Sequence, residues 1–289
     1  MDTNIGAKER VTQNRLIGLF KNVLKYTYLG NWETREDNAN IEEKLLTAYL
    51  SRRGYTDKEI RSSIVKLKQS ANSLGGGLYN ANKEVYTFLR YGVNIQAEVT
   101  EKKKMVHLID WANPMENDFQ IAEEVTIQGA SDRRPDLVVY VNGIALAVIE
   151  LKRSTVSAHE GIRQNIRNQQ DGYIPRFFTT IQLLFAGNDT EGLHYGVIKT
   201  PEKFWLRWKE PCGEPCQPSH FTAKEYPNEL DRSVLQFFEP VRLLEYIHDF
   251  IIFDGGIKKT ARPNQYFAVK AAQPRVRKKQ NGIISVSYT

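Results

Sequence analysis

The stretch RRPDLVVYVNGIALAVIELK, residues 133–152, decides more about the fold than any other part of the chain. Two apolar, β-branched runs flank Asn142-Gly143, a dipeptide typical of tight turns between antiparallel strands. We therefore expect a β-hairpin with strands over 137–141 and 144–151. Asp136 stands just before the first strand. Glu150 and Lys152 stand two residues apart at the end of the second, so their side chains share one face.

These three ionisable residues point to metal chemistry, because carboxylates are costly to bury unless a cation or another partner compensates. Asp136 and Glu150 would hold Mg²⁺, which binds oxygen ligands, polarises a phosphate and activates a bound water. Lys152 would position that water and offset the charge that develops on the phosphate. The alternative is a surface hairpin on which Glu150 and Lys152 form an ordinary ion pair, worth under about 1 kcal/mol.

The loop of the hairpin decides whether this site can form. A two-residue loop would pair Asp136 with Ile149 and place it on the face opposite Glu150. A three-residue loop over 141–143, with Gly143 in the left-handed conformation, would pair Asp136 with Val148 and return it to the face of Glu150. Since the metal site needs the second register, we predict the three-residue loop.

Around the hairpin, the hydrophobic period changes from helical to extended near residue 94. Helices are expected over 11–25, 41–53, 58–74, 83–89, 157–170 and 233–253. Strands are expected over 93–99, 106–110, 122–127, 137–141, 144–151, 181–186 and 194–197. Ser157 and Glu160 have the spacing of a capping box at the start of the crossover helix. The fold class is therefore α/β, a mixed β-sheet flanked by helices, with a helical N-terminal part and a C-terminal helical extension.

Composition and charge limit the class of protein to which the chain can belong. The chain has 289 residues, 41% of them hydrophobic, and a net charge of +6, enough for one large or two ordinary domains. Cys212 and Cys216 alone build neither a disulfide framework nor a zinc site, and the longest apolar run, 144–149, is too short for a membrane span, so we expect a cytoplasmic protein. Basic residues gather near the end, either as a nucleic-acid contact or as a solvated face. They are Lys258, Lys259, Arg262, Lys270, Arg275, Arg277, Lys278 and Lys279.

Pro135-Asp136 followed by Glu150-Leu151-Lys152 resembles the motif of the PD-(D/E)XK nuclease superfamily. Four flanking segments are similar to the N-terminal endonuclease region of type I restriction enzyme R (restriction) subunits, and the resemblance covers most of 11–210. They are HLIDW (107–111), NDF (117–119), NGIALAVIELK (142–152) and FFTTIQLLFAGNDTEGLHYG (177–196). The resemblance implies a restriction-endonuclease-like fold that hydrolyses phosphodiester bonds of foreign DNA with Mg²⁺.

That family places a Gln-x3-Tyr motif on the helix after the catalytic strand. Gln164 stands where the glutamine is expected, but Asn168 occupies the position of the tyrosine. We favour Gln164 as the fourth catalytic residue. Gln169 and Tyr173 are the alternative pair, and a solvent-facing polar helix is the third possibility. Related nucleases also often carry a glutamate on the first helix, where Glu9 is the nearest carboxylate and receives no assignment.

The resemblance also implies a division of the chain and a set of partners. Residues 1–210 would be the nuclease domain, 211–260, which begin with three prolines in eight residues, a linker and helical segment, and 261–289 the start of a truncated helicase-like motor. RPNQYFAV (262–269) resembles the segment before that motor, with Gln265 as the candidate adenine contact. No phosphate-binding G-x4-G-K-[ST] loop follows, so ATP would bind only to the full-length subunit.

Expected partners are double-stranded DNA and the methylation (M) and specificity (S) subunits of a restriction-modification complex. The alternative function is a non-catalytic nucleic-acid-binding or assembly module with a degenerate nuclease fold. Metal binding would separate the two.

Overall fold

The computed structural model describes residues 5–96, 103–211, 220–279 and Gly282. Its helices are α1 (Ile5–Asn22), α2 (Glu43–Arg52), α3 (Asp57–Asn72), α4 (Gly77–Tyr91), α5 (Ala158–Asn168), α6 (Glu229–Phe238), α7 (Pro240–Asp249) and α8 (Pro263–Arg277). Its strands are β1 (Thr27–Asn31), β2 (Val93–Ile95), β3 (Lys104–Val106), β4 (Phe119–Glu123), β5 (Leu137–Val141), β6 (Ile144–Leu151), β7 (Leu183–Asn188), β8 (Gly192–Gly196), β9 (Leu206–Arg207), β10 (Ile251–Asp254) and β11 (Ile257–Thr260).

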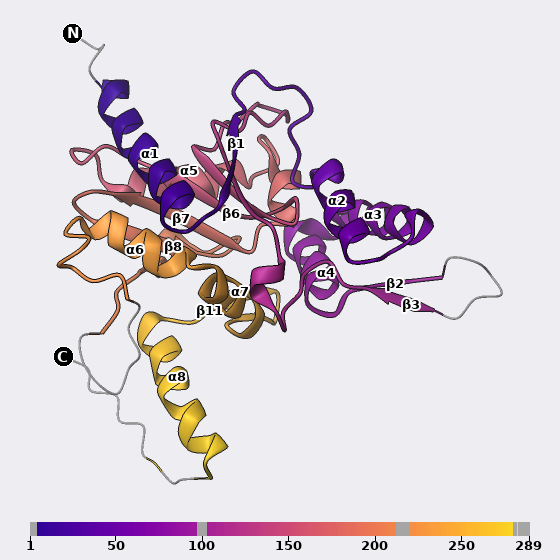
Figure 1. The fold of residues 1–289 in the computed structure, drawn as a ribbon. Coiled ribbons are helices and arrows are strands. Elements are labelled where there is room, and N and C mark those ends of the chain that lie inside the picture. Colours follow the sequence, from indigo (N-terminus) through magenta and orange to yellow (C-terminus); the bar gives the residue numbers. More distant parts are fainter. Residues whose placement is uncertain (1–4, 97–102, 212–219, 280–281, 283–289) are drawn as a thin grey trace.

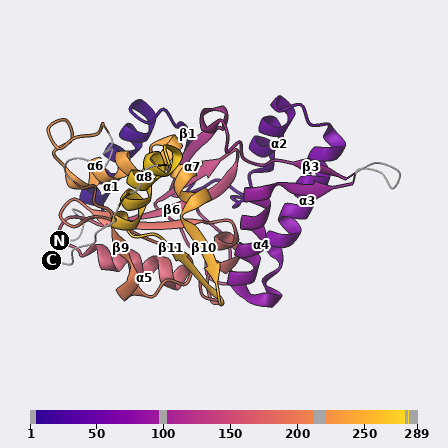
Figure 2. The same cartoon turned by 90° about the horizontal axis from the view of Figure 1, so that it is seen from below.

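A mixed sheet forms the centre of the described part, as predicted. Its strand order is β1-β4-β5-β6-β7-β8-β9, with parallel pairing at β1/β4 and β6/β7 and antiparallel pairing elsewhere. Helix α5 makes the crossover between the parallel strands β6 and β7 and covers one face. Helices α1, α6 and α7 lie on the other face (Figure 2). The predicted α/β class is therefore confirmed, with β5 and β6 buried along their whole length.

The β5–β6 hairpin corrects the predicted loop but keeps the face that the site needs. Val141 pairs with Ile144, so the loop has two residues, and both Asn142 and Gly143 have positive φ. The extra residue lies farther along, at Leu146, where the pairing shifts by one as a β-bulge in β6. Beyond it, Leu137 pairs with Ile149. Continuing this register by one residue places Asp136 opposite Glu150, on the same face.

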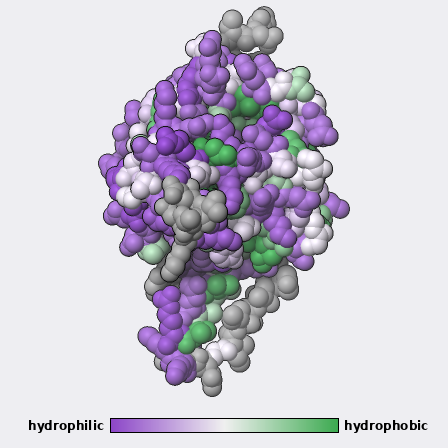
Figure 3. Space-filling view, turned by 90° about the vertical axis from the view of Figure 1, so that its right-hand side faces the viewer, coloured by the Kyte–Doolittle hydropathy of each residue, from purple (hydrophilic) through white to green (hydrophobic). Residues whose placement is uncertain are grey.

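Helices α2, α3 and α4 and the β2–β3 hairpin project from one side of the sheet (Figure 1). Seen from that side, the surface is mostly hydrophilic with small, scattered hydrophobic spots (Figure 3). Helix α4 runs over 15 residues and not over the short span 83–89, because Gly77, with a φ of 81°, lets the helix begin six residues earlier. The strand expected over 106–110 ends at Val106.

The C-terminal half departs most from expectation. The helix predicted over 233–253 is two helices separated at Pro240, which begins α7 because proline lacks an amide hydrogen. The end of the predicted helix is the strand β10, and the basic segment that follows contains β11 and the helix α8. Lys258 is buried rather than solvated, with 4% of its surface exposed. Strand β1 was missed because its partner, β4, lies far along the chain. Strand β9 was missed because it has only two residues.

Two further expectations meet different outcomes. Ser157 is the N-cap of α5, but its hydroxyl accepts from His159 N, and Glu160 pairs with Arg163, so the reciprocal capping box does not form. The division at 210 and 260 stays a prediction, although one aromatic cluster crosses both boundaries and joins Trp208, Phe237 and Tyr266.

Some predicted features lie outside the described residues. They are the end of the strand over 93–99 and both cysteines, with most of the proline-rich boundary. Within the described residues, no helix combines the length and the apolarity that a bilayer span needs.

Candidate active site

The predicted carboxylates meet where β5 begins and β6 ends. Asp136 Oδ2 accepts a hydrogen bond of 2.6 Å from Leu151 N, which fixes its carboxyl against the end of β6. Glu150 is fully buried, and the charge of Asp136 contributes to its raised pKa, so the two carboxyl groups are neighbours. The bulge at Leu146 is what makes this contact possible, since without it the two side chains would leave the sheet on opposite faces.

Lys152 lies beside the carboxylates and is joined by a glutamate from α1. Its Nζ atom is 3.3 Å from Glu9 Oε1 and donates to Leu151 O at 2.8 Å. Burial opposes the charge of Lys152, but Asp136, Glu150 and Glu9 outweigh it and raise its pKa. Lys152 is therefore a charged donor held among three carboxylates.

Burial and crowding shift both acidic pKa values upward. Burial, which Lys152 opposes, raises the pKa of Asp136 to about 6. Burial, followed by the charge of Asp136, raises the pKa of Glu150 well above its ordinary value. Paired carboxylates with raised pKa values are typical of sites that work with a proton or a cation.

One oxygen of this pair has no partner. Glu150 Oε2 accepts from Gln164 Nε2 at 2.7 Å, while Glu150 Oε1 is buried and has no hydrogen bond to any described residue. A buried, unpaired carboxylate oxygen next to a second carboxylate is suited to bind a cation. The described residues hold no cluster of three or more His, Cys, Asp or Glu side chains able to bind a metal. A cation here would therefore take two carboxylates, with water or backbone oxygen completing its shell.

The structure distinguishes the candidates on α5. Gln164 contacts Glu150, whereas Gln169 accepts from Lys199 N at 2.7 Å and donates to Asn165 O at 2.9 Å. Tyr173 lies beyond the helix with its ring 4.1 Å from the guanidinium of Arg133. Of the predicted residues on this segment, Gln164 is therefore the one brought to the carboxylates.

Helix α5 can approach β6 closely because of one glycine. A Cβ atom at Gly161 would lie 3.1 Å from Ala186 Cβ and 3.3 Å from Glu150 O. Asn168, which stands where the tyrosine of the motif was expected, is buried, and both of its side-chain polar atoms lack a partner among the described residues.

Sequence reasoning named Glu9 without assigning it and did not single out the other charged groups near Asp136. Helix α1 begins at Ile5, six residues before the predicted start, and this places Glu9 on the helix. Glu123 ends β4 and Glu124 follows it, and Gln13 Nε2 donates to Glu123 Oε2 at 2.9 Å. An acidic residue one turn before the apolar stripe of the first helix was the available signal for Glu9.

Gln265 lies away from this set. Its side-chain oxygen accepts from Arg262 N at 2.9 Å and caps the start of α8. An adenine contact by Gln265 stays a prediction.

Comparisons with known proteins show the family of the chain. The family model "Type I restriction enzyme R protein N terminus" matches residues 6–203. A putative type I restriction enzyme endonuclease subunit (MjaIXP) of Methanocaldococcus jannaschii is 25% identical over 93% of this chain and 28% of its own length. The type I restriction enzyme HindI endonuclease subunit of Haemophilus influenzae is 27% identical over 71% of this chain and 20% of its own length. The chain thus spans less than a third of these relatives.

Proposed function

The chain belongs to the family of type I restriction enzyme R protein N termini, and from that membership we propose that it is the Mg²⁺-dependent endonuclease part of such a subunit. Its substrate would be the phosphodiester backbone of double-stranded foreign DNA. The observation that carries the proposal is the unpaired, buried Oε1 atom of Glu150 beside Asp136 and Lys152.

Each residue of the set has a distinct part in this mechanism. Asp136 and Glu150 would hold the cation, which supplies Lewis-acid stabilisation of the phosphate and a more acidic bound water. Gln164 fixes Glu150 through Oε2 and leaves Oε1, which has no partner among the described residues, as the oxygen that would bind the cation. Lys152, kept protonated by the surrounding carboxylates, donates toward the phosphate oxygen that gains charge as water attacks. Glu9 orients the Lys152 ammonium, from which it lies 3.3 Å away.

The relatives' names, each an endonuclease subunit of a type I restriction enzyme, support the wider setting of the proposal. In that setting the chain works in a complex with methylation and specificity subunits, and ATP is bound by the motor of the full-length subunit. Sequence selection would then come from the specificity subunit, because backbone contacts alone carry no sequence information.

Metal binding by the 289-residue chain is the first test. Isothermal titration with Mn²⁺ should show binding to the wild type and its loss in Asp136→Ala and Glu150→Gln. Glu160→Gln is the matched control, because that carboxylate is exposed on α5 and pairs with Arg163. Undiminished binding in Asp136→Ala and Glu150→Gln would place the cation elsewhere.

Cleavage is the second test. In the full-length subunit with its partners, Asp136→Ala or Lys152→Ala should lower DNA cleavage by roughly 10²-fold or more. ATP hydrolysis and translocation should stay intact, because they use the separate motor. DNA binding without metal binding or cleavage would favour the non-catalytic module instead.

A further inference from the structure

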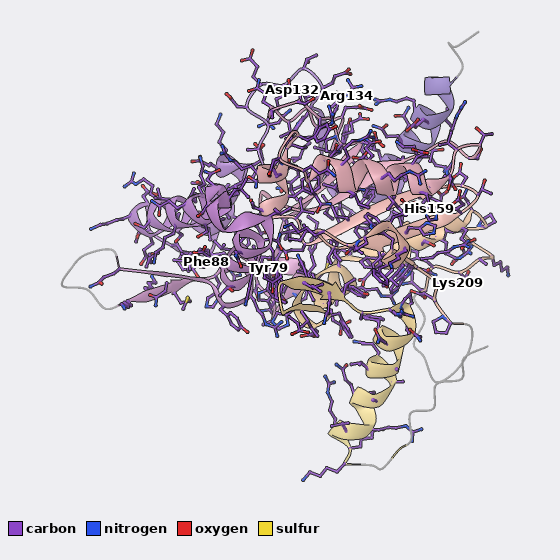
Figure 4. The ribbon with its side chains drawn as sticks, turned by 180° about the vertical axis from the view of Figure 1, so that it is seen from behind. Tyr79, Phe88, Asp132, Arg134, His159 and Lys209 are labelled. Atoms are coloured by element: carbon purple, nitrogen blue, oxygen red, sulfur yellow. The ribbon has the colours of Figure 1, made fainter. Side chains whose placement is uncertain are left out.

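Two arginines lie at the edge of the candidate site, each close in sequence to one of its residues. Arg10 follows Glu9 on α1, and Arg134 precedes Asp136 by two residues on the loop that joins β4 and β5. Figure 4 shows Arg134 beside Asp132 on this loop, at the margin of the molecule. The two arginines are far apart in the sequence, and folding brings them to one place.

Glu124 joins the two arginines. Arg10 NH1 lies 3.2 Å from Glu124 Oε1, and Arg134 Nε lies 2.9 Å from Glu124 Oε2. Each arginine has a second carboxylate as well: Arg10 NH1 is 2.9 Å from Glu123 Oε2, and Arg134 pairs with Glu33. Glu123 and Glu124 are mostly buried, with side chains 5% and 14% exposed, so they hold the arginines from the protein side.

Glu124 itself has an unusual backbone. Its φ is 51°, a left-handed conformation that a non-glycine residue adopts rarely and at some cost in energy. The neighbouring contacts enforce this conformation, because Glu124 N donates to Asp136 O at 2.9 Å. The charge of Glu124 also contributes to the raised pKa of Asp136, which places its carboxylate close to the candidate site.

The arginines keep an open side. Their side chains are 39% and 47% exposed, although both are ion-paired. A guanidinium has five N–H donors, and Arg10 NH2 and Arg134 NH2 have no hydrogen bond to any described residue. A planar fork fixed on one edge and open on the other matches the geometry of a phosphate group.

We propose that Arg10 and Arg134 form a pair of phosphate-binding residues, positioned by Glu124, that seats the DNA backbone over Asp136 and Glu150. This inference rests on the proposed function and deepens it by naming the residues that receive the substrate. The need for them follows from charge, because three carboxylates, Glu9, Asp136 and Glu150, act on Lys152, and the charge of Glu124 reaches Asp136. A polyanion approaches such a site more readily if cations line its edge.

The test measures DNA binding without metal. The 289-residue chain is titrated in EDTA with a fluorescent, double-stranded DNA at a series of NaCl concentrations, and log Kd is plotted against log[NaCl]. Each phosphate contact contributes about 0.9 to the slope of such a plot. Arg10→Ala and Arg134→Ala should each lower the slope by about that amount, and the double variant by about twice as much.

Two further variants separate phosphate binding from a structural role. Arg134→Lys keeps the charge but not the planar fork, so it should keep the slope and bind more weakly. Arg52→Ala is the matched control, because Arg52 is an exposed, ion-paired arginine on α2 and its partner is Asp118, away from the candidate site. It should leave the slope unchanged.

An unchanged slope in Arg10→Ala and Arg134→Ala, with or without a lower melting temperature, would make these arginines structural ion pairs only and overturn the inference. Cleavage with Mg²⁺, measured in parallel on the full-length subunit, keeps the two proposals apart. Normal cleavage by the wild type together with unchanged slopes in the arginine variants would overturn only the inference about the arginine pair. Absence of both DNA binding and cleavage in the wild type removes the proposed function with it.

Discussion

Two buried polar clusters in this molecule differ in how completely they are hydrogen-bonded. At the end of the sheet, Glu150 and Asp136 crowd together, and Glu150 Oε1 has no partner among the described residues. Where the β10–β11 hairpin meets α4, the buried Lys258 Nζ donates to Asn82 Oδ1 at 2.8 Å and to Gln182 Oε1 at 2.7 Å. The first cluster leaves one carboxylate oxygen unpaired, whereas in the second the lysine is hydrogen-bonded by side-chain amides.

This difference distinguishes a ligand-binding site from a polar cluster that holds segments of the fold together. A satisfied polar cluster fixes the arrangement of the segments that supply it, because losing any member orphans the others. Lys258 ties the C-terminal hairpin to α4 and to the segment that enters β7. An unsatisfied carboxylate pair instead lowers the stability of the free protein and becomes favourable when a cation arrives.

The largest stability effect should come from the closed cluster. Lys258→Met leaves the side-chain oxygens of Asn82 and Gln182 without their donor, so the free energy of unfolding should fall by roughly 2 kcal/mol. Urea denaturation followed by circular dichroism measures the change. Lys259→Met is the neighbouring control, because Lys259 pairs with Asp254 at the surface and its loss should change stability by less than about 0.5 kcal/mol. A gain in stability in Lys258→Met would contradict this prediction, because the buried lysine would then destabilise the fold as the carboxylate pair is expected to do.

The open cluster should respond with the opposite sign. Glu150→Gln removes a carboxylate whose burial beside Asp136 raises its pKa, so the metal-free variant should be more stable by roughly 1–2 kcal/mol. The same urea titration, in EDTA at neutral pH, provides the measurement. Saturating Mn²⁺ should reverse the order by stabilising the wild type alone. A loss of stability in EDTA would contradict the view of Glu150 as a strained ligand.

The third prediction concerns a difference in pH dependence. The pKa of Asp136 rises from 3.8 to about 6 on folding, so the folded protein holds its proton more tightly, and this contribution to stability is lost as pH rises through that interval. Lys258 behaves in the reverse way: its pKa is lowered by burial, so its contribution grows as pH rises toward 10.5. Melting curves of the wild type minus Asp136→Asn should isolate the acidic change between about pH 4 and 6. A flat difference would show that Asp136 titrates normally.

Sequence predicted those parts of the molecule that local pattern decides. The hairpin strands and the expected shared face of Glu150 and Lys152 follow from spacing along the sequence. Gln164, which contacts Glu150, was indicated by the family resemblance instead. Leu146 could not be identified as the bulge, because it stands in a uniform apolar run in which any residue fits either face.

Tertiary contacts decided the rest. Lys258 reads as one of many surface lysines, and only the packing of the hairpin against α4 buries it. The ion pairs of Arg10 and Arg134 with Glu124 join α1 to the β4–β5 loop, and Arg10 and Glu124 are 114 residues apart in the sequence. Strand β1 was hidden for the same reason, since its partner β4 lies far along the chain.

The bulge at Leu146 also restricts how this segment can change in length. Between Asp136 and Glu150 lie thirteen residues, two of them in the turn and one in the bulge. Deleting or inserting a single residue in this interval inverts one strand relative to the other and separates the carboxylates, whereas a change of two preserves their shared face. Length variation in the hairpin is therefore tolerated in even steps, or in odd steps that gain or lose a bulge at the same time.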